Sequence, residues 1–323
     1  MIDKEHMLDH IEAFPRWILQ AYDLASAKIV EKPVSNVLSM GMGGSGISGL
    51  LVKSLLADTQ VPMDAVLSPT LPKDIGKETL AFIVSYSGNT LEALDAYREA
   101  QRKGCKIVAI PSGGNLAKRA ISDEKMLIQV PTGIPPRASL PYLLFPMVRV
   151  LQNADLIPDQ RDAVLNASKV LMKPEYRERG EDLAGDLSDR IPLIYSTPFM
   201  APAAYRWKCQ INENAKASAF TNVFPELMHN EVEGFTNLKM EPHVLMLREE
   251  NVTGLVEKGF KVVKRELKQR CHVTELVFKE RDPMSRLLSA VYIGDWVSYF
   301  LAIKYNTDPS PNPVISEVKR HIS

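Results

Sequence analysis

The chain has 323 residues, of which 45% are hydrophobic and 24% charged, as is ordinary for a globular protein. Its 39 basic and 39 acidic residues balance, which argues against nucleic acid as the main partner. Because a single core rarely serves more than about 250–300 residues, we expect two domains.

The N-terminal stretch MIDKEHMLDHIEAFPRWILQAYDLA places acidic and apolar residues at helical spacing. It lacks a basic segment followed by an apolar one, so we expect no secretory signal. We find no apolar run near the roughly 18 residues of a membrane span and expect no membrane partner. Cys105, Cys209 and Cys271 are scattered and form no CxxC pair. Such cysteines favour buried thiols in a reducing cytoplasm over a disulfide framework or a zinc site.

In the first half of the chain, short β-like runs alternate with helical patterns, which favours a parallel sheet covered by helices. Strands are expected at 36–40, 63–68, 80–85, 106–110 and 126–130. Helices are expected near 46–57, 91–103, 115–121 and 139–153. This alternation predicts a small doubly wound domain over residues 1–155.

A charged region over 156–190 follows, and we expect it to be a helical connection because it lacks a Gly/Ser/Pro tract. A second α/β series comes after it. Its strands are expected at 191–196, 218–223, 243–248 and 272–278, and its helices near 201–215, 253–270 and 285–304. The predicted class is therefore α/β, with a second doubly wound domain over 191–323 that ends in a terminal helix.

Two Gly/Ser-rich segments stand where a strand should end and a helix begin: GMGGSG over 41–46 and SYSGNT over 85–90. They follow the first and third strands, which are neighbours at the switch point of the common 2-1-3-4-5 strand order. Hydroxyl donors in these loops are Ser45, Ser85, Ser87 and Thr90. The helix after Thr90 adds N–H groups and a positive dipole end. Together the loops predict a site for one phosphate monoester.

Each loop alone has a simpler interpretation. Asn89 followed by Glu92 has the spacing of a capping box, so SYSGNT by itself would be an ordinary helix start. GMGGSG has the GxGxxG spacing of a dinucleotide-binding turn. The acidic residue expected at the end of the second strand is missing, however, since Asp64 falls at the beginning of that strand. The pairing of the two loops therefore favours a phosphate monoester over NAD.

With both loops in view, the sequence resembles the sugar isomerase (SIS) domains, whose Ser/Thr-rich loop binds the phosphate of phosphosugars. PPRASLPYLL, INENAK, PELMHNEVEGF and a lysine in the terminal helix narrow the resemblance to the bifunctional phosphoglucose/phosphomannose isomerases. The resemblance covers nearly the whole chain and implies two flavodoxin-like SIS subdomains. It also implies a homodimer that interconverts glucose, mannose and fructose 6-phosphates through an enediol(ate), with no cofactor and no metal.

The resemblance assigns roles to matching residues. Gly44 and the four hydroxyl residues would hold the substrate phosphate. Glu213 would be the catalytic base and Arg137 the cation beside the enediolate. His229, reaching in from the second subunit, and Lys319 would assist ring opening. The chemistry agrees, because a carboxylate can carry a proton between C1 and C2 while a permanently charged Arg stabilises the enediolate.

Three of these residues also have simpler interpretations: Glu213 as a solvated helix charge, Arg137 as a surface-loop residue and Lys319 as a helix-end charge. His229 differs from them, since it lies in a polar turn between apolar segments. Rival carboxylates near Glu213 are Glu226, Glu231 and Glu233. One departure from the family is Asn312, which stands seven residues before Lys319 where the family has a Thr, and it leaves the balance between glucose and mannose open. Two alternative functions remain, namely another tandem-SIS isomerase that acts on an amino-sugar phosphate and a non-catalytic phosphosugar sensor.

Overall fold

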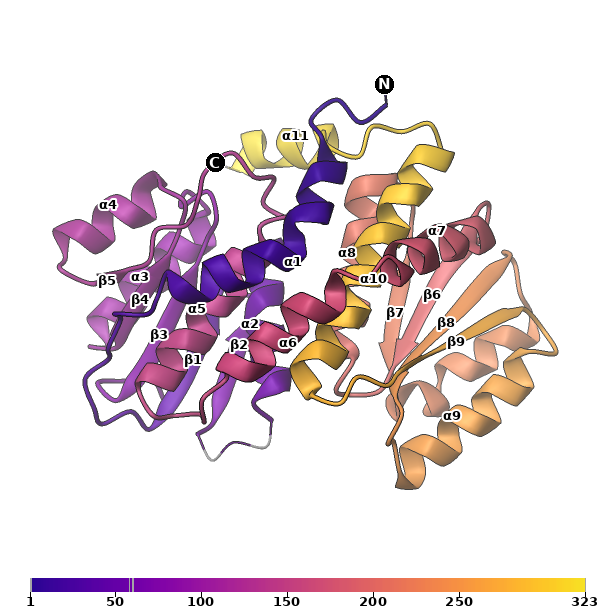
Figure 1. The fold of residues 1–323 in the computed structure, drawn as a ribbon, viewed down its shortest axis with the longest axis horizontal. Helices are drawn as coiled ribbons and strands as arrows, with labels where there is room; N and C mark the ends of the chain where they lie inside the picture. The colour runs from indigo at the N-terminus through magenta and orange to yellow at the C-terminus, as the bar shows by residue number, and fades with distance from the viewer. Residues whose placement is uncertain (1, 58, 60, 323) are drawn as a thin grey trace. The chain divides into compact units, whose positions relative to one another are not determined.

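The protein is described by a computed structural model over residues 2–57, 59 and 61–322 (Figure 1). Its contacts divide the chain into two compact units. The first-sheet unit comprises Glu12–Ser168 with Val314–Ser323, and the second-sheet unit comprises Met1–Ile11 with Lys169–Pro313. Each unit is built around one parallel sheet, and each is described by itself below.

The first-sheet unit contains a five-stranded parallel sheet in the order β2-β1-β3-β4-β5, which is the order assumed for the two Ser/Gly loops. Its strands are β1 (Asn36–Met40), β2 (Met63–Val66), β3 (Thr79–Val84), β4 (Lys106–Ile110) and β5 (Met126–Leu127). The helices up to residue 171 are α1 (Met7–Asp23), α2 (Gly43–Leu55), α3 (Leu91–Arg102), α4 (Gly114–Ser122), α5 (Leu140–Asn153) and α6 (Arg161–Leu171).

Both faces of this sheet are covered, which explains why its central strands are continuous apolar runs. All six residues of β3 are buried. Alternate strand residues such as Leu38 and Ile83 pack with Tyr97 of α3 and Leu116 of α4 on one face. On the other face, Ser39 of β1 donates to the Met147 sulfur of α5 at 3.6 Å. The unit is therefore doubly wound, as predicted.

The second-sheet unit contains a four-stranded parallel sheet in the order β7-β6-β8-β9. Its strands are β6 (Ile191–Ser196), β7 (Phe220–Val223), β8 (Pro242–Glu249) and β9 (His272–Phe278). Its helices are α7 (Glu175–Leu187), α8 (Ala201–Gln210), η1 (Ile211–Ala215), η2 (Glu226–His229), η3 (Glu231–Thr236), α9 (Gly254–Leu267) and α10 (Pro283–Lys304). The last helix, α11 (Pro313–Ile322), belongs from Val314 onward to the first-sheet unit. Phe260 and Val263 of α9 join one face of the sheet to Tyr195 and Met246 in a single core cluster.

Helix α10 corrects one expectation from the sequence. It is long and apolar enough to cross a membrane by length and composition, although no such run was expected. However, 83% of its most apolar 18-residue window is buried inside the protein. It packs along α7 and α8 (Figure 1). Its apolar character is therefore that of a core helix.

The predicted elements agree with the structure except at a few ends. Strands 36–40, 106–110, 191–196 and 272–278 are confirmed residue for residue. The fifth strand is shorter than predicted and ends at Leu127. The helix predicted over 201–215 changes character after Gln210, where the last five residues form the π-helix η1. This change matters because η1 carries Glu213.

Candidate active site

The loops after β1 and β3 meet at the carboxyl edge of the first sheet. The two strands pair in parallel. Across the loops, the backbone N–H of Tyr86 donates to Oγ of buried Ser45 at 3.2 Å. Within the second loop, Ser85 Oγ donates to Thr90 Oγ1 at 3.0 Å. The predicted convergence of the two loops is therefore confirmed, and it brings together hydroxyls from both.

Helix α3 begins without the capping box that its sequence suggests. Its N-cap is Thr90, which makes no side-chain cap hydrogen bond. Asn89 instead accepts, through Oδ1, from the backbone N–H of Asn115 at 3.0 Å. Gly88 has φ +67°, and a Cβ there would lie 1.9 Å from the Gly113 carbonyl oxygen. The loop is thus packed against the start of α4, while no N-cap side chain covers the positive end of α3.

Helix α2 also begins without a side-chain cap, at Met42. A Cβ on Gly44 would lie 3.2 Å from the Pro136 carbonyl oxygen and 3.3 Å from the Arg137 Cα. The segment that carries Arg137 therefore lies directly against the first turn of α2. Arg137 is 5% exposed, so the simpler interpretation of it as a surface-loop residue is wrong. A buried guanidinium needs polar partners, which is typical of a binding site or a structural ion pair.

Tyr86 joins these parts and was not among the residues predicted from the sequence. Its hydroxyl donates to the Pro131 carbonyl oxygen at 2.9 Å and accepts from the Ile134 N–H at 2.9 Å. Burial raises the pKa of Tyr86, and the Ile134 bond partly offsets this. Through its backbone and its ring, Tyr86 ties Ser45 to the segment that precedes Arg137. The sequence feature that could have indicated Tyr86 is a single aromatic residue in a loop otherwise made of Ser, Gly, Asn and Thr.

Glu213 lies in the second-sheet unit, at the centre of the π-helix η1. Short π-helices frequently occur at functional sites. The side chain is half-buried, and its Oε2 accepts from Asn312 Nδ2 at 3.1 Å. The next residue, Asn214, is fully buried and donates to Ser298 Oγ of α10 at 2.9 Å. The backbone around Glu213 is thereby fastened to the core helix.

A buried ion pair between α8 and α10 stabilises the segment directly before η1. Arg206 of α8 forms two parallel bonds to Asp295 of α10, at 2.9 and 2.8 Å. Gln210, the last residue of α8, donates to Asp295 Oδ1 at 2.9 Å. Arg206 and Asp295 are 1% and 2% exposed. This bidentate geometry fixes α8 on α10 immediately before η1 begins.

His229 ends the short helix η2 and is exposed. Its neighbour Glu231, one of the rival carboxylates, is engaged elsewhere. Glu231 accepts from the Tyr195 hydroxyl at 2.7 Å and also from Asn222 Nδ2. Burial, followed by the bond to Glu231, raises the pKa of Tyr195. Glu231 therefore holds the segment of His229 on strands β6 and β7, which is a structural role.

Lys319 lies in the last turn of α11, where it is exposed. A cation at this position also complements the helix dipole. Lys319 therefore fits a helix-end charge as well as the predicted role in ring opening. The same helix exposes Val314, Ile315 and Val318, which lie on one side of it at helical spacing.

Comparison with known proteins gives the family. Residues 177–322 match the bacterial phospho-glucose isomerase C-terminal SIS domain. A bifunctional phosphoglucose/phosphomannose isomerase from Aquifex aeolicus is 33% identical over 296 residues, which cover 90% of this chain and 91% of that protein. The chain belongs to this isomerase family. The predicted family and enzyme class are confirmed.

Two further comparisons extend this result. A D-glucosamine-6-phosphate 4-epimerase from Sulfolobus acidocaldarius is 32% identical over 220 residues, which cover 67% of each chain. A crystal structure of a hypothetical protein from Thermus thermophilus has a TM-score of 0.78 at 14% identity, over 99% of this chain and 90% of that one. The second comparison confirms the predicted α/β fold.

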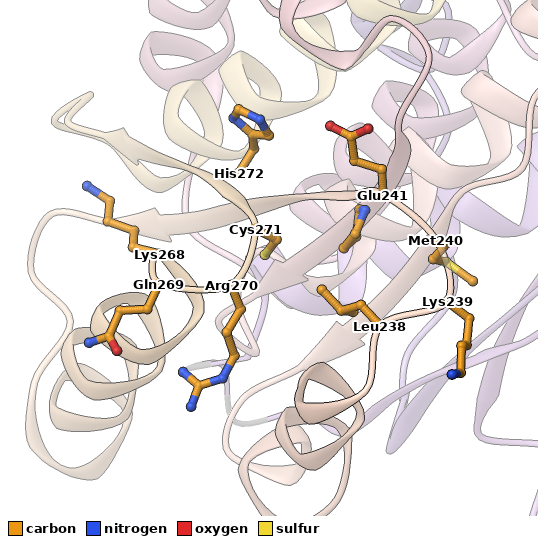
Figure 2. Close-up of a pocket in the computed structure, with 10 residues that line it drawn as sticks. Leu238, Lys239, Met240, Glu241, Lys268, Gln269, Arg270, Cys271 and His272 are labelled. Carbon is orange, nitrogen blue, oxygen red and sulfur yellow. The ribbon is translucent and has the colours of Figure 1, made fainter.

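A depression of about 770 Å³ lies at the amino-terminal edge of the second sheet, and none of its lining residues is a predicted site residue (Figure 2). It is lined by segments 238–242 and 268–272, which precede β8 and β9. Figure 2 shows Cys271 near Leu238, with Arg270 and Lys239 extending outward. Burial raises the pKa of the Cys271 thiol to about 11, so the thiol is protonated at neutral pH. Because ligands of open parallel sheets bind at the carboxyl ends of the strands, we do not assign this depression to the active site.

Proposed function

We propose that the protein is an aldose–ketose isomerase that interconverts glucose 6-phosphate and mannose 6-phosphate with fructose 6-phosphate, without a metal or other cofactor. The observation that supports this proposal most directly is the hydrogen bond between the loops that precede α2 and α3, in a chain of this isomerase family. The Tyr86–Ser45 bond links the two loops, and buried Arg137 lies against one of them.

The phosphate is assigned to the ends of α2 and α3. Two helix N-termini directed at one anion supply N–H donors and positive dipole ends, which suit a phosphate dianion. Hydroxyls and backbone from both loops complete the cradle, namely Gly44, Ser45, Ser85, Ser87 and Thr90. Because neither helix start has a side-chain cap bond, no cap has to be displaced when the anion binds.

The proton transfer is assigned to Glu213. In the open-chain aldose, the carboxylate takes the proton from C2, and the C–H electron pair becomes the C1–C2 double bond while the carbonyl electrons move to O1. The hydroxyl proton of O2 then passes to O1, and the electrons left on O2 form the C2–O2 carbonyl as the C1–C2 double bond takes the proton back from Glu213 at C1, which gives the ketose. Arg137 stabilises the charge on the enediol(ate) oxygens, since a guanidinium stays protonated throughout. His229 and Lys319 move the proton from the anomeric hydroxyl to the ring oxygen when the sugar opens.

We also propose a cytoplasmic homodimer in which His229 serves the active site of the partner subunit. The free state of Cys105, Cys209 and Cys271 supports a reducing compartment. The apolar side of α11 supports association, because Val314 is 74% and Val318 54% exposed in one copy.

A coupled assay of the purified protein tests this function. Turnover of glucose 6-phosphate and mannose 6-phosphate is expected to persist in EDTA and to be lost in Glu213→Gln. Loss of turnover in EDTA, or full activity in Glu213→Gln, would contradict the mechanism. Equilibrium sedimentation of the same sample tests the dimer.

The similarity to a D-glucosamine-6-phosphate 4-epimerase favours one second candidate, an enzyme that acts on an amino-sugar phosphate. The same assay with glucosamine 6-phosphate separates the two functions. Turnover of the amino sugar alone would favour the second candidate. Tight binding of hexose 6-phosphates without any turnover would instead indicate a sensor.

A further inference from the structure

Lys216 ends the π-helix of Glu213 in an unusual way. Its backbone is left-handed, with φ 53° and ψ 30°. Residues other than glycine adopt this conformation rarely, and mostly at helix ends and turns. Its ammonium donates to three carbonyl oxygens, those of Glu213 at 2.6 Å, Asn214 at 3.3 Å and Pro309 at 3.1 Å. An ammonium has three N–H groups, so each donor has an acceptor.

The third acceptor separates this arrangement from an ordinary helix end. Lysines often bind the last carbonyls of their own helix. Pro309, however, lies 93 residues further along the chain, in the segment between α10 and α11. Lys216 therefore fastens that segment to the end of η1, and both belong to the second-sheet unit.

Asn312 lies three residues beyond Pro309 and makes the second connection. Its Nδ2 donates to Glu213 Oε2 at 3.1 Å. Residues 309–312 thus meet η1 at two points, at its backbone through Lys216 and at the carboxylate itself. The terminal torsion of a glutamate is broad and permits many orientations of the carboxylate. A hydrogen bond to one named oxygen restricts that rotation.

We propose that Asn312 and Lys216 are positioning residues that hold the carboxylate of Glu213 for proton transfer, and this rests on the proposed role of Glu213 as the base. Lys216 fixes the segment that carries Asn312, and the Asn312 amide fixes Oε2. Proton transfer depends steeply on such placement.

Two variants and one control test this proposal against wild type by kcat and KM. Asn312→Leu keeps the size of the side chain and removes the amide. Lys216→Met keeps the stem and removes the three donors. Asn312→Leu and Lys216→Met are each expected to lower kcat about 10- to 100-fold with a smaller change in KM, because the loops assigned to the phosphate remain intact. Asn212→Ala is the matched control, since Asn212 neighbours Glu213 in η1 but donates to the Ala217 carbonyl oxygen.

Asn312→Asp gives a readout that a purely structural role would not move. It places a second carboxylate where an amide now lies 3.1 Å from Glu213. Two adjacent carboxylates retain a shared proton to higher pH, so the acidic limb of the kcat/KM profile should shift upward by about one pH unit. Lys216 and Cys209 also lie near Glu213, and both are unchanged in this variant.

The outcomes separate this inference from the proposed function. If Glu213→Gln is inactive while Asn312→Leu keeps kcat within twofold and Asn312→Asp keeps the wild-type pH profile, the positioning role is wrong and the isomerase mechanism stands. An equal loss in Asn212→Ala, with a lowered melting temperature, would also overturn the positioning role. A wild-type protein without turnover, or an active Glu213→Gln, would overturn both proposals.

Discussion

The two sheets have corresponding strand orders but differ at their switch points. In the first sheet, the loop after β1 offers Ser45 to the loop after β3, and both adjoining helices begin without side-chain caps. In the second sheet, the matching neighbours are β6 and β8. There Thr197, just after β6, donates to the carboxylate of Glu249 at the end of β8.

This difference shows how one topology supports two tasks. A carboxylate at the second switch point repels a phosphate, so the second sheet is not suited to bind one. Its first helix, α8, instead leads into the π-helix that carries Glu213. We infer that the first sheet binds the phosphate and that the second supplies the base. The following predictions test that division, beginning with the largest expected effect.

Replacing the base should have the largest effect. Glu213→Gln is expected to lower kcat about 100- to 10,000-fold with little change in KM, because only proton transfer is lost. Glu233→Gln is the control, since Glu233 is an exposed rival carboxylate in the same unit. A similar loss in both variants would remove the distinction between them. The measurement is steady-state turnover of fructose 6-phosphate.

Breaking the buried pair beneath η1 should destabilise the second-sheet unit. Asp295→Asn leaves the Arg206 charge buried without its counter-charge, and this costs about 3–5 kcal/mol. Urea unfolding of the variant measures the loss in free energy. Asp282→Asn would be a poor control, since Asp282 caps α10. Glu266→Gln serves better, because its ion pair with Arg265 is exposed and such pairs contribute about 0–1 kcal/mol.

A side chain added at Gly88, in the Ser/Gly loop after β3, should displace that loop and weaken substrate binding. Gly88→Ala requires a side chain at φ +67° and 1.9 Å from the Gly113 carbonyl oxygen, so the loop must shift. We expect KM to rise about tenfold and stability to fall by about 1–3 kcal/mol. Gly113→Ala is the matched control, because a Cβ there meets no atom within 4 Å. Unchanged KM in Gly88→Ala would separate this loop from the phosphate.

Removing single hydroxyls compares the two switch points directly. Ser45→Ala in the first sheet is expected to raise KM about three- to tenfold, the value of one hydrogen bond to a charged group or somewhat less. Thr197→Val in the second sheet should leave KM unchanged, since its partner is Glu249. Competition by inorganic phosphate, measured in both variants, checks that the effect lies on the anion. Equal effects in the two variants would contradict the division of tasks.

Lowering the pH should have the smallest effect, a loss of stability in the second sheet. His243 of β8 is buried, and burial lowers its pKa below the ordinary value. As the pH falls through about 6.5, the unfolded chain therefore takes up a proton that the folded chain does not, and stability declines. Amides of β8 and β9 are expected to lose more exchange protection than those of β1 and β3 between about pH 7 and about pH 5.5. Replacement by His243→Gln should abolish that contrast.

Much of the fold follows from local sequence. The mostly apolar run NVLSM lies between Ser35 and Gly41, and KIVAI lies between Cys105 and Pro111. Both runs form strands with the predicted ends. The convergence of the two Ser/Gly loops also followed, because a topological rule relates strand order to loop position. The roles of Glu213 and Arg137 came from resemblance to the family, since single residues carry too little local signal.

Other features required the tertiary structure. INENA has an ordinary helical composition, and its π-helix depends on the contacts of Asn214 and Lys216 with distant segments. The sequence alone does not separate Glu231 from Glu213 as the candidate base. The structure does, because Tyr195 and Asn222 both donate to Glu231, which gives it a structural role. Asn312 reaches Glu213 across 99 residues of chain. Local composition determines strands, helices and loops, whereas the partner of a polar side chain depends on which distant segments packing brings within about 3 Å.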